Sequence, residues 1–279
     1  MPKIAIFSMD VEEWYDSTCL LNVKIEQNIS TLDGIETYLH LLDKYHIKST
    51  LFTLSSLTLQ AKDILLKASR EGHEIALHGK FHVVPMSKST LDFEDDIRCA
   101  KKEIEEMLGV SITGYRAPCF SIDRERIDIL KKSGFRFDSS SMDYMPENHH
   151  TKLTIAGKNI HGIIKDDDFY EFPIATGRIF GKKMPISGGG YLRIIPWWAY
   201  RGALHHYMKT NDIYVFYVHP FELSKKVLPR FKEIGLFENS YFKRGRKSYY
   251  DRIERLIKML QKHGFIFKTF NQIVNEFDQ

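Results

Sequence analysis

Residues 4–13, IAIFSMDVEE, consist of an apolar run followed by a cluster of carboxylates, and the fold can be predicted outward from this segment. The run Ile4–Met9 is apolar at nearly every position, which predicts a strand buried on both faces, as in a parallel sheet. Parallel strands need crossover connections, and the sequence supplies them, since short apolar runs alternate with helical patterns. This alternation predicts a succession of β/α units and an α/β fold. The further predicted strands cover 49–54, 74–77, 114–116, 135–138 and 213–219, and the predicted helices cover 35–45, 61–70, 93–108, 124–133, 196–208 and 249–263.

A chain of 279 residues with 43% hydrophobic and 27% charged residues has the composition of a globular protein and is long enough for one large domain. The predicted architecture is a single distorted (β/α) barrel of seven or eight strands that spans residues 1–279. Residues 139–170 interrupt the alternation, because they are polar and develop no apolar period. We interpret them as a long irregular excursion from the barrel and not as a second domain.

The net charge and the cysteine content indicate which binding partners and which cellular compartment to expect for this protein. A net charge of +4 is too small to indicate a nucleic-acid partner. The three cysteines, Cys19, Cys99 and Cys119, are odd in number and lack the spacing of a zinc knuckle or redox pair, which favours a reducing compartment. The first apolar run is too short for a secretory signal, and no run approaches the roughly 18 apolar residues of a membrane span. We therefore expect a cytoplasmic protein.

The positive charge is concentrated near the C-terminus, where residues 225–262 hold twelve Lys or Arg and four Asp or Glu. One interpretation is a solvated helix face. The other is a surface that meets the pyrophosphate of a nucleotide- or lipid-linked glycan, or that makes peripheral contact with the anionic inner membrane surface.

Polar residues follow four predicted strands at the end where β/α barrels build their sites. His78 and His82 are four residues apart, so their imidazoles can converge on one cation, with Glu12 or Asp10 as a third ligand. Two histidines and one carboxylate leave positions open for water and substrate, as a catalytic zinc site requires. The other side chains at strand ends are Arg116, which could keep Asp10 ionised, and His219, which is either a core residue or a general acid.

Five motifs in this order resemble the polysaccharide deacetylases, the NodB-homology family or carbohydrate esterase family 4, over residues 4 to about 222. They are DVEEW at 10–14, HGKFH at 78–82, RAP at 116–118, DSS at 138–140 and HP at 219–220. In addition, SGGGYLR at 187–193 and PFE at 220–222 resemble a subgroup associated with surface-polysaccharide biosynthesis.

The resemblance implies metal-dependent hydrolysis of the amide of an N-acetylated sugar. It makes His78 and His82 metal ligands, Asp10 the base that takes a proton from the attacking water, and Arg116 the partner of Asp10. It makes His219 the acid that protonates the leaving amine and Asp138 the residue that orients His219. A backbone N–H just after Pro118 could help to hold the developing oxyanion. The candidate substrate contacts are Trp14, Pro118, Phe120 and Tyr191.

The sequence departs from the family pattern at two places. The family commonly has two adjacent aspartates, of which the second binds metal, but this chain has Val11 there. In an extended segment Asp10 and Glu12 point to the same side, so we predict that Glu12 supplies the missing ligand. Zinc is the expected ion, with cobalt, nickel or manganese as alternatives. The usual aromatic residue after the RAP motif comes one position late, as Phe120, with Cys119 between.

These observations favour a metal-dependent carbohydrate de-N-acetylase that acts during biosynthesis of a bacterial surface polysaccharide of the O-antigen or capsule type. Its partner would be an N-acylated sugar on a nucleotide- or lipid-linked glycan. Two alternatives stay open. One is another metal-dependent C–N hydrolase on the same barrel, such as a deformylase or a cyclic-amide hydrolase. The other is a barrel that has lost catalysis and binds glycan, an interpretation suggested by Val11.

Overall fold

The structure, a computed structural model, describes residues 2–17, 20, 23, 26–142, 157–229 and 234–279. Its strands are β1 (Lys3–Val11), β2 (Thr50–Thr53), β3 (Glu74–Leu77), β4 (Gly114–Tyr115), β5 (Phe137–Asp138), β6 (Lys158–Ile160), β7 (Ile163–Asp166), β8 (Phe169–Glu171), β9 (Thr176–Ile179), β10 (Lys182–Pro185), β11 (Ile213–Val218) and β12 (Phe265–Phe267). Its helices are α1 (Asp33–Asp43), α2 (Lys62–Arg70), α3 (Thr90–Leu108), α4 (Arg124–Lys132), α5 (Gly189–Ile194), α6 (Trp197–Thr210), α7 (Pro220–Leu223), α8 (Leu236–Lys243), α9 (Tyr249–Lys262) and α10 (Phe270–Phe277).

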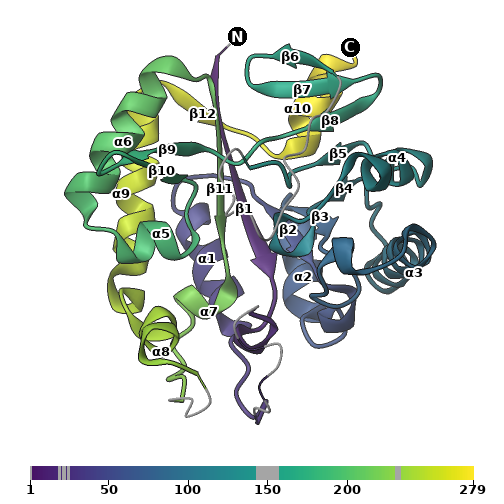
Figure 1. Cartoon of the computed structure of the whole chain (residues 1–279), viewed down its shortest axis with the longest axis horizontal. Coiled ribbons are helices and arrows are strands. Elements are labelled where there is room, and N and C mark those ends of the chain that lie inside the picture. The colour runs from purple at the N-terminus through teal and green to yellow at the C-terminus, as the bar shows by residue number, and fades with distance from the viewer. Residues whose placement is uncertain (1, 18–19, 21–22, 24–25, 143–156, 230–233) are drawn as a thin grey trace.

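A curved sheet with the order β11-β1-β2-β3-β4-β5-β8-β7-β6 forms the centre of the molecule, and β12 also pairs with β1. The strands from β11 through β8 pair in parallel, with helices covering the two sides of the sheet in Figure 1. The segment 186–188 connects the chain that follows β8 with the edge strand β11, since Ile186 N–H donates to Ala175 O (3.0 Å) and Tyr217 N–H donates to Ser187 O (2.8 Å). The predicted distorted (β/α) barrel is therefore confirmed.

The predicted irregular excursion at 139–170 is wrong for its second half. Strands β6 and β7 form an antiparallel pair, and β7 pairs with β8, so this segment extends the main sheet. Its apolar pattern is weak because the strands are three or four residues long and because Lys158 and Asn159 on β6 are exposed. Residues 143–156 of the predicted excursion lie outside the described residues.

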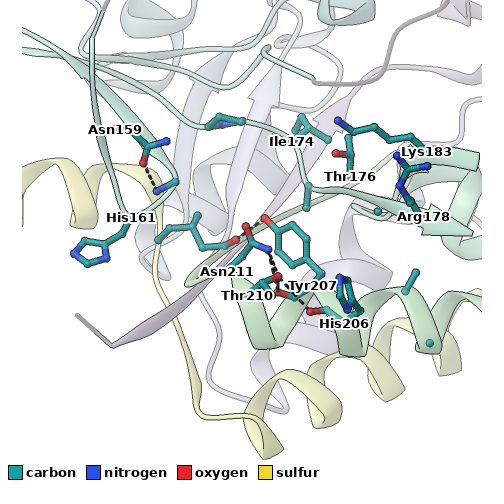
Figure 2. Close-up of a pocket in the computed structure, with 17 residues that line it drawn as sticks. Asn159, His161, Ile174, Thr176, Arg178, Lys183, His206, Tyr207, Thr210 and Asn211 are labelled. Atoms are coloured by element: carbon teal, nitrogen blue, oxygen red, sulfur yellow. Dashed lines mark hydrogen bonds between the residues drawn. The ribbon is translucent and has the colours of Figure 1, made fainter.

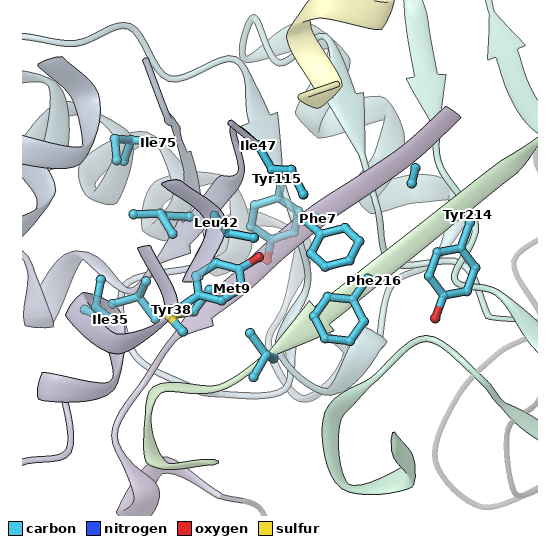
Figure 3. Packing of buried hydrophobic residues seen from close by; sticks show 14 of the residues in the cluster. Phe7, Met9, Ile35, Tyr38, Leu42, Ile47, Ile75, Tyr115, Tyr214 and Phe216 are labelled. Atoms are coloured by element: carbon cyan, nitrogen blue, oxygen red, sulfur yellow. The ribbon is translucent and has the colours of Figure 1, made fainter. Parts of the chain in front are cut away.

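Two apolar layers hold the sheet, and β1 contributes to both through its alternation of side chains. Phe7, Met9 and Val11 belong to the cluster between the sheet and the surrounding helices, part of which Figure 3 shows around Phe7 and Met9. Ile4 and Ile6 belong to the other cluster, inside the curve of the sheet, where α10 fills the space with Phe270, Ile273 and Val274. The inner positions that follow on β1, Ser8 and Asp10, are buried and polar.

Helix ends agree with the local sequence. Ser89 accepts a hydrogen bond from Asp92 N–H at the start of α3, and Gly109 ends this helix with a φ of 65°, the left-handed conformation that glycine adopts without strain. In α1, a β-carbon on Gly34 would lie 1.9 Å from the backbone oxygen of Pro220, so only glycine allows α1 to pack this closely on α7. Within the residues that the structure describes, no helix combines the length and apolarity needed to cross a bilayer.

Candidate active site

The polar side chains that the sequence predicted at strand ends come together at the carboxyl ends of β1, β3, β4 and β11. Strand alternation explains the convergence, because inner positions on β1 and β11 lead to Asp10 and His219, and Ala76 on β3 leads to His78. The residues that precede Asp10, His78 and His219 on these inner faces include Ile6, Ala76 and Tyr217, which belong to the apolar layer inside the curve of the sheet. The side chains of the candidate site follow at the carboxyl ends of the strands, where β/α barrels build their sites.

Glu12, His78 and His82 form the candidate metal centre. Their ligand atoms lie within 4.8 Å of one another, and all three side chains are buried. Glu12 Oε2 is 2.9 Å from His82 Nε2 and 3.8 Å from His78 Nε2. Two imidazoles and one carboxylate are a donor set that suits zinc and leave further coordination positions for water and substrate. The residues therefore fit the metal that the sequence predicts.

The histidine orientations also suit metal binding. His78 Nδ1 lies 2.8 Å from the backbone oxygen of Arg116, so this nitrogen donates its proton there and Nε2 is the nitrogen available as a ligand. Such a partner fixes the tautomer of a ligating imidazole. Nδ1 of His82 is buried and has no hydrogen-bond partner among the described residues.

Burial and charge set the protonation of this group. Burial alone would raise the pKa of Glu12, but the facing imidazoles of His82 and His219 outweigh it and lower that pKa to about 2. Burial lowers the pKa of His78 to about 4, so its imidazole is neutral at pH 7. Burial also opposes the charged form of His82, but Glu12 raises its pKa. An ionised carboxylate beside a neutral imidazole is ready to receive a cation.

Asp10 is held by Arg116 on the side of the site away from solvent. The guanidinium NH1 donates to Asp10 Oδ1 (2.7 Å) and to Ser8 Oγ (2.8 Å), and both members of the ion pair are buried. Nε and NH2 donate to the backbone oxygen and the hydroxyl of Ser139. The guanidinium also lies 4.1 Å from the ring centre of Phe52. Arg116 is therefore rigidly placed and keeps Asp10 in one orientation.

His219 points its Nε2 toward Glu12, with 3.5 Å between Nε2 and Oε1. Its other nitrogen, Nδ1, lies 3.1 Å from Glu222 Oε2. Glu222 is fully buried and accepts a hydrogen bond from Arg193 Nε (2.9 Å), which is also buried. Burial opposes the charged form of His219, but Glu12 and Glu222 together raise its pKa to about 9. The imidazole is thus a proton donor at neutral pH in the metal-free protein.

The prediction that Asp138 orients His219 is wrong, because the carboxylate bonded to His219 is that of Glu222. Strand alternation gives the reason. Phe137 faces the inner layer, so the next residue on β5, Asp138, faces away from it. There Asp138 Oδ1 accepts from Ser140 Oγ (2.7 Å), and its carboxyl group hydrogen-bonds to that of Glu171. Burial raises the pKa of both carboxyl groups, so the pair shares a proton.

The four predicted substrate contacts differ in exposure. Trp14 is fully buried, donates from Nε1 to Ile29 O (2.7 Å) and packs with Phe221 and Phe242. The prediction that it contacts substrate is wrong, because the ring is covered by protein. Pro118 is buried as well and shapes the turn that follows Arg116. Phe120 and Tyr191 are half-buried and stay candidates.

The turn at 118–120 has an unusual backbone, since Cys119 and Phe120 both have positive φ angles, 57° and 56°. Such angles strain residues other than glycine and recur at functional sites. The N–H groups of Phe120 and Ser121 donate within the turn, whereas that of Cys119 has no partner among the described residues. Burial raises the pKa of the Cys119 thiol to about 12, so this thiol is neutral at pH 7 in the metal-free protein.

Sequence reasoning missed the roles of Arg193 and Glu222. Both lie in stretches that the sequence singled out, SGGGYLR and PFE, but without a role for either residue. The spacing of Glu222 three residues after His219 was an available signal, because residues three apart meet on a helical turn. The ion pair with Arg193 spans 29 residues and had no local signal.

A separate cavity of about 750 Å³ lies near the amino end of β11 and is lined by Arg178, Lys183, His206, Tyr207 and neighbouring residues, as Figure 2 shows. None of the three candidate metal ligands lines it. It is thus distinct from the site at the carboxyl ends of the strands.

Comparison with known proteins agrees with the family resemblance and the fold. Residues 31–137 match the family model described as "Polysaccharide deacetylase", and residues 140–275 match one described as a domain of unknown function (DUF3473). The chain is 31% identical over 119 residues to a peptidoglycan deacetylase of Helicobacter pylori and 30% identical over 113 residues to a peptidoglycan deacetylase-like protein of Gibberella zeae. These matches cover 40% and 38% of this chain but only 39% and 32% of the two relatives.

Solved structures are similar over nearly the whole chain. A protein of Mycobacterium smegmatis assigned to the polysaccharide deacetylases has a TM-score of 0.68 at 15% identity, covering 99% of this chain and 90% of that one. An allantoinase has a TM-score of 0.65 at 12% identity, covering 98% and 90%. A carbohydrate esterase family 4 pseudoenzyme of Bacillus anthracis has a TM-score of 0.56 at 9% identity, covering 98% and 66%. Residues 31–137 therefore carry the polysaccharide deacetylase domain whose family the five motifs resemble, and the fold of the chain agrees with these solved structures.

Proposed function

We propose that this protein is a metal-dependent de-N-acetylase of an N-acetylated sugar within a glycan. The observation that carries the proposal is the buried cluster of Glu12, His78 and His82 beside two further groups suited to acid–base work, Asp10 and His219. Glu12, His78 and His82 would hold one divalent ion, with zinc preferred over cobalt, nickel or manganese. A bound ion would polarise the acyl oxygen and lower the pKa of a water molecule in the site to about 7.

Asp10 is the base in this mechanism, because Arg116 holds its carboxyl group in one orientation and because it lies on the same face of the chain as Glu12. We assign to the N–H of Cys119 a hydrogen bond to the oxygen that becomes negative during attack on the amide carbon, since this N–H donates to no other described residue. His219 then gives its Nε2 proton to the leaving amine, which would otherwise depart as an unstable anion. Glu222 and Arg193 hold the ring of His219 for this transfer, and Phe120 and Tyr191 contact the sugar.

We further propose that the substrate is an intermediate of a bacterial surface polysaccharide of the O-antigen or capsule type, carried on a nucleotide or a lipid, and that the protein acts in the cytoplasm, in peripheral contact with the inner membrane. The support is the basic stretch 225–262 and the resemblance of SGGGYLR and PFE to a subgroup with that role. The curated relatives named above are described as peptidoglycan deacetylases or similar to them, which keeps cell-wall glycan as the competing substrate.

The test combines metal content with product identity. The purified protein should retain about one divalent ion after dialysis and release acetate from N-acetylated sugar oligomers. The His78→Ala/His82→Ala variant should lose both properties. The matched control is His205→Ala/His206→Ala, which alters two exposed histidines on α6 and should lose neither.

Release of formate from N-formyl sugars, or hydrolysis of a cyclic amide such as allantoin, in place of acetate release would identify another C–N hydrolase on this fold. A protein that binds N-acetylglucosamine oligomers, holds no ion and releases no product would be a glycan-binding barrel without catalysis. Either result would replace the proposed function.

A further inference from the structure

A second cavity, of about 1160 Å³, opens beside α7 and has a cationic wall. It lies between the first turns of α1, the end of α7, and the segment from Lys243 to Tyr250. Figure 1 shows α7 between α1 and α8, near the carboxyl ends of β1 and β11. Because α7 begins directly after His219 and ends at Leu223, this cavity starts four residues beyond the candidate proton donor.

Five cationic side chains line the cavity, against two carboxylates. The carboxylate of Asp33 is occupied, because Oδ1 accepts from Ser224 Oγ and Oδ2 accepts from Lys225 N–H (3.0 Å). Glu36 is the second acid. The lysine, arginine and carboxylate side chains of the wall therefore add up to a net charge of +3. The cationic residues are Lys225, Lys226, Lys243, Arg246 and Lys247.

The four lysines are exposed and take part in no ion pair among the residues that the structure describes. Arg246 differs, because it is fixed in the wall by hydrogen bonds from NH2 to Ser224 O (2.7 Å) and Lys226 O (2.9 Å). Its Nε is buried and has no partner in the described part of the chain. Burial, followed by repulsion from Arg193, lowers the pKa of this guanidinium, although Asp33 and Glu222 act in the opposite direction.

The remaining lining of this cavity is apolar. Leu223 and Leu228 are buried with exposed fractions of 6% and 2%, whereas Val227 is 85% exposed and Tyr250 is half-buried. A cavity with clustered cations above apolar side chains complements a compact, highly charged anion attached to a less polar group. Among anions carried by sugars, a diphosphate has this character, since several oxygens can each accept a hydrogen bond from a different lysine or arginine.

We infer that this cavity binds the diphosphate group of the substrate, so that the enzyme acts on a sugar still attached to its carrier. The inference rests on the proposed function in one respect, namely that the diphosphate is the group that joins the substrate sugar to its carrier. Lys243, Arg246 and Lys247 would donate hydrogen bonds to the phosphate oxygens. The segment from His219 to Leu223 connects these residues' cavity to the candidate proton donor.

The experiment measures the binding of inorganic pyrophosphate by calorimetry at low ionic strength. Wild type should bind, and Lys243→Glu/Lys247→Glu should bind at least tenfold more weakly. The matched control is Lys132→Glu/Lys182→Glu, which reverses two exposed lysines outside the cavity and should bind as wild type does. The affinity of wild type should also fall as salt is added, because exposed charges are screened.

Two further arms separate the sources of a diphosphate. Uridine diphosphate and farnesyl diphosphate are compared with pyrophosphate, and tighter binding of one of them identifies a nucleotide or a prenyl lipid as the carrier. Equal binding of all three places the recognition in the diphosphate alone, which also supports the inference.

Binding must also survive in the His78→Ala/His82→Ala variant, because pyrophosphate is itself a metal ligand. Absence of pyrophosphate binding in wild type, loss in the histidine variant, or equal affinity in Lys243→Glu/Lys247→Glu would overturn the inference. Failure of the proposed function appears elsewhere, as absent metal and absent acetate release, so the two failures are distinguishable.

Discussion

The contact between Glu222 and His219 allows a quantitative prediction. The perturbation is Glu222→Gln, which keeps the size of the side chain and removes its charge. In the metal-free protein the pKa of His219 is raised from 6.5 to about 9. This difference of about 2.5 pH units corresponds to about 3.4 kcal/mol in favour of the imidazolium.

Two carboxylates face the ring, at 3.1 Å for Glu222 and 3.5 Å for Glu12. At an effective dielectric constant of about 20, Coulomb's law gives attractions of about 5.4 and 4.7 kcal/mol, so the two make nearly equal contributions before the cost of burial is subtracted. The attraction of Glu222, about 5.4 kcal/mol, exceeds the net 3.4 kcal/mol, so without it the cost of burial outweighs the remaining attraction of Glu12. We therefore expect the pKa of His219 in Glu222→Gln to fall by more than 2.5 pH units, to below 6.5.

The assay is an NMR titration of His219 in chelator-treated protein, followed by the pH profile of deacetylation with zinc restored. Because a glutamine at 222 can offer its amide nitrogen to the ring and hold the wrong tautomer, kcat should fall about 10²- to 10⁴-fold with KM little changed. Arg193 would lose its buried counter-charge, so the free energy of unfolding is measured in parallel.

The matched control is Asp138→Asn, the residue that the sequence predicted would orient His219. Its carboxyl group bonds to Ser140 and Glu171, so the variant should leave the pKa of His219 unchanged. The reasoning is refuted if Asp138→Asn lowers that pKa and Glu222→Gln does not.

Three further predictions concern stability. Val11→Asp should lower the free energy of unfolding by about 3 kcal/mol in urea denaturation without changing metal content, because residue 11 is buried against the helices; a gain in metal affinity would contradict this. Arg116→Met leaves Asp10 buried without its partner and should cost about 3–5 kcal/mol in the same assay, so a loss below about 1 kcal/mol would show that the pair is solvated. Burial raises the pKa of Glu74 from 4.5 to about 7, so the native protein binds more protons than the unfolded chain between these values and stability falls as pH rises through 7. Glu74→Gln should therefore match wild type near pH 4 and exceed its stability at pH 8, by at most about 3 kcal/mol, and parallel pH profiles would exclude this origin.

The sequence predicted those parts of the site that depend on strand periodicity. A period of two sufficed to place Asp10 and Glu12 on one face, and the positions of His78, Arg116 and His219 after apolar runs sufficed to place them at one end of the barrel. The same rule explains the apolar character of Val11, because its side chain packs in the layer between the sheet and the helices.

The rest depended on contacts between distant segments. Whether Asp138 or Glu222 serves His219 is decided by the direction in which β5 presents Asp138, and a two-residue strand has no pattern from which to predict it. Trp14 lies next to the metal ligands in sequence, yet its ring turns into a cluster with Phe221 and Phe242. Strands β6 and β7 were not predicted from the sequence, because strands this short and exposed have little alternation of apolar and polar residues.

The boundary between the two matched family models falls near residue 139, yet it passes through one candidate active site. The candidate metal ligands all precede it, whereas His219, Glu222 and the five cationic residues that line the cavity beside α7 all follow it. We propose that residues 1–279 nevertheless fold as one unit, since β1 pairs with both β11 and β12. Replacement of the segment after residue 139 by another sequence would then change the proposed carrier site and the surroundings of His219 together. The candidate metal ligands would stay the same, because they lie before this residue.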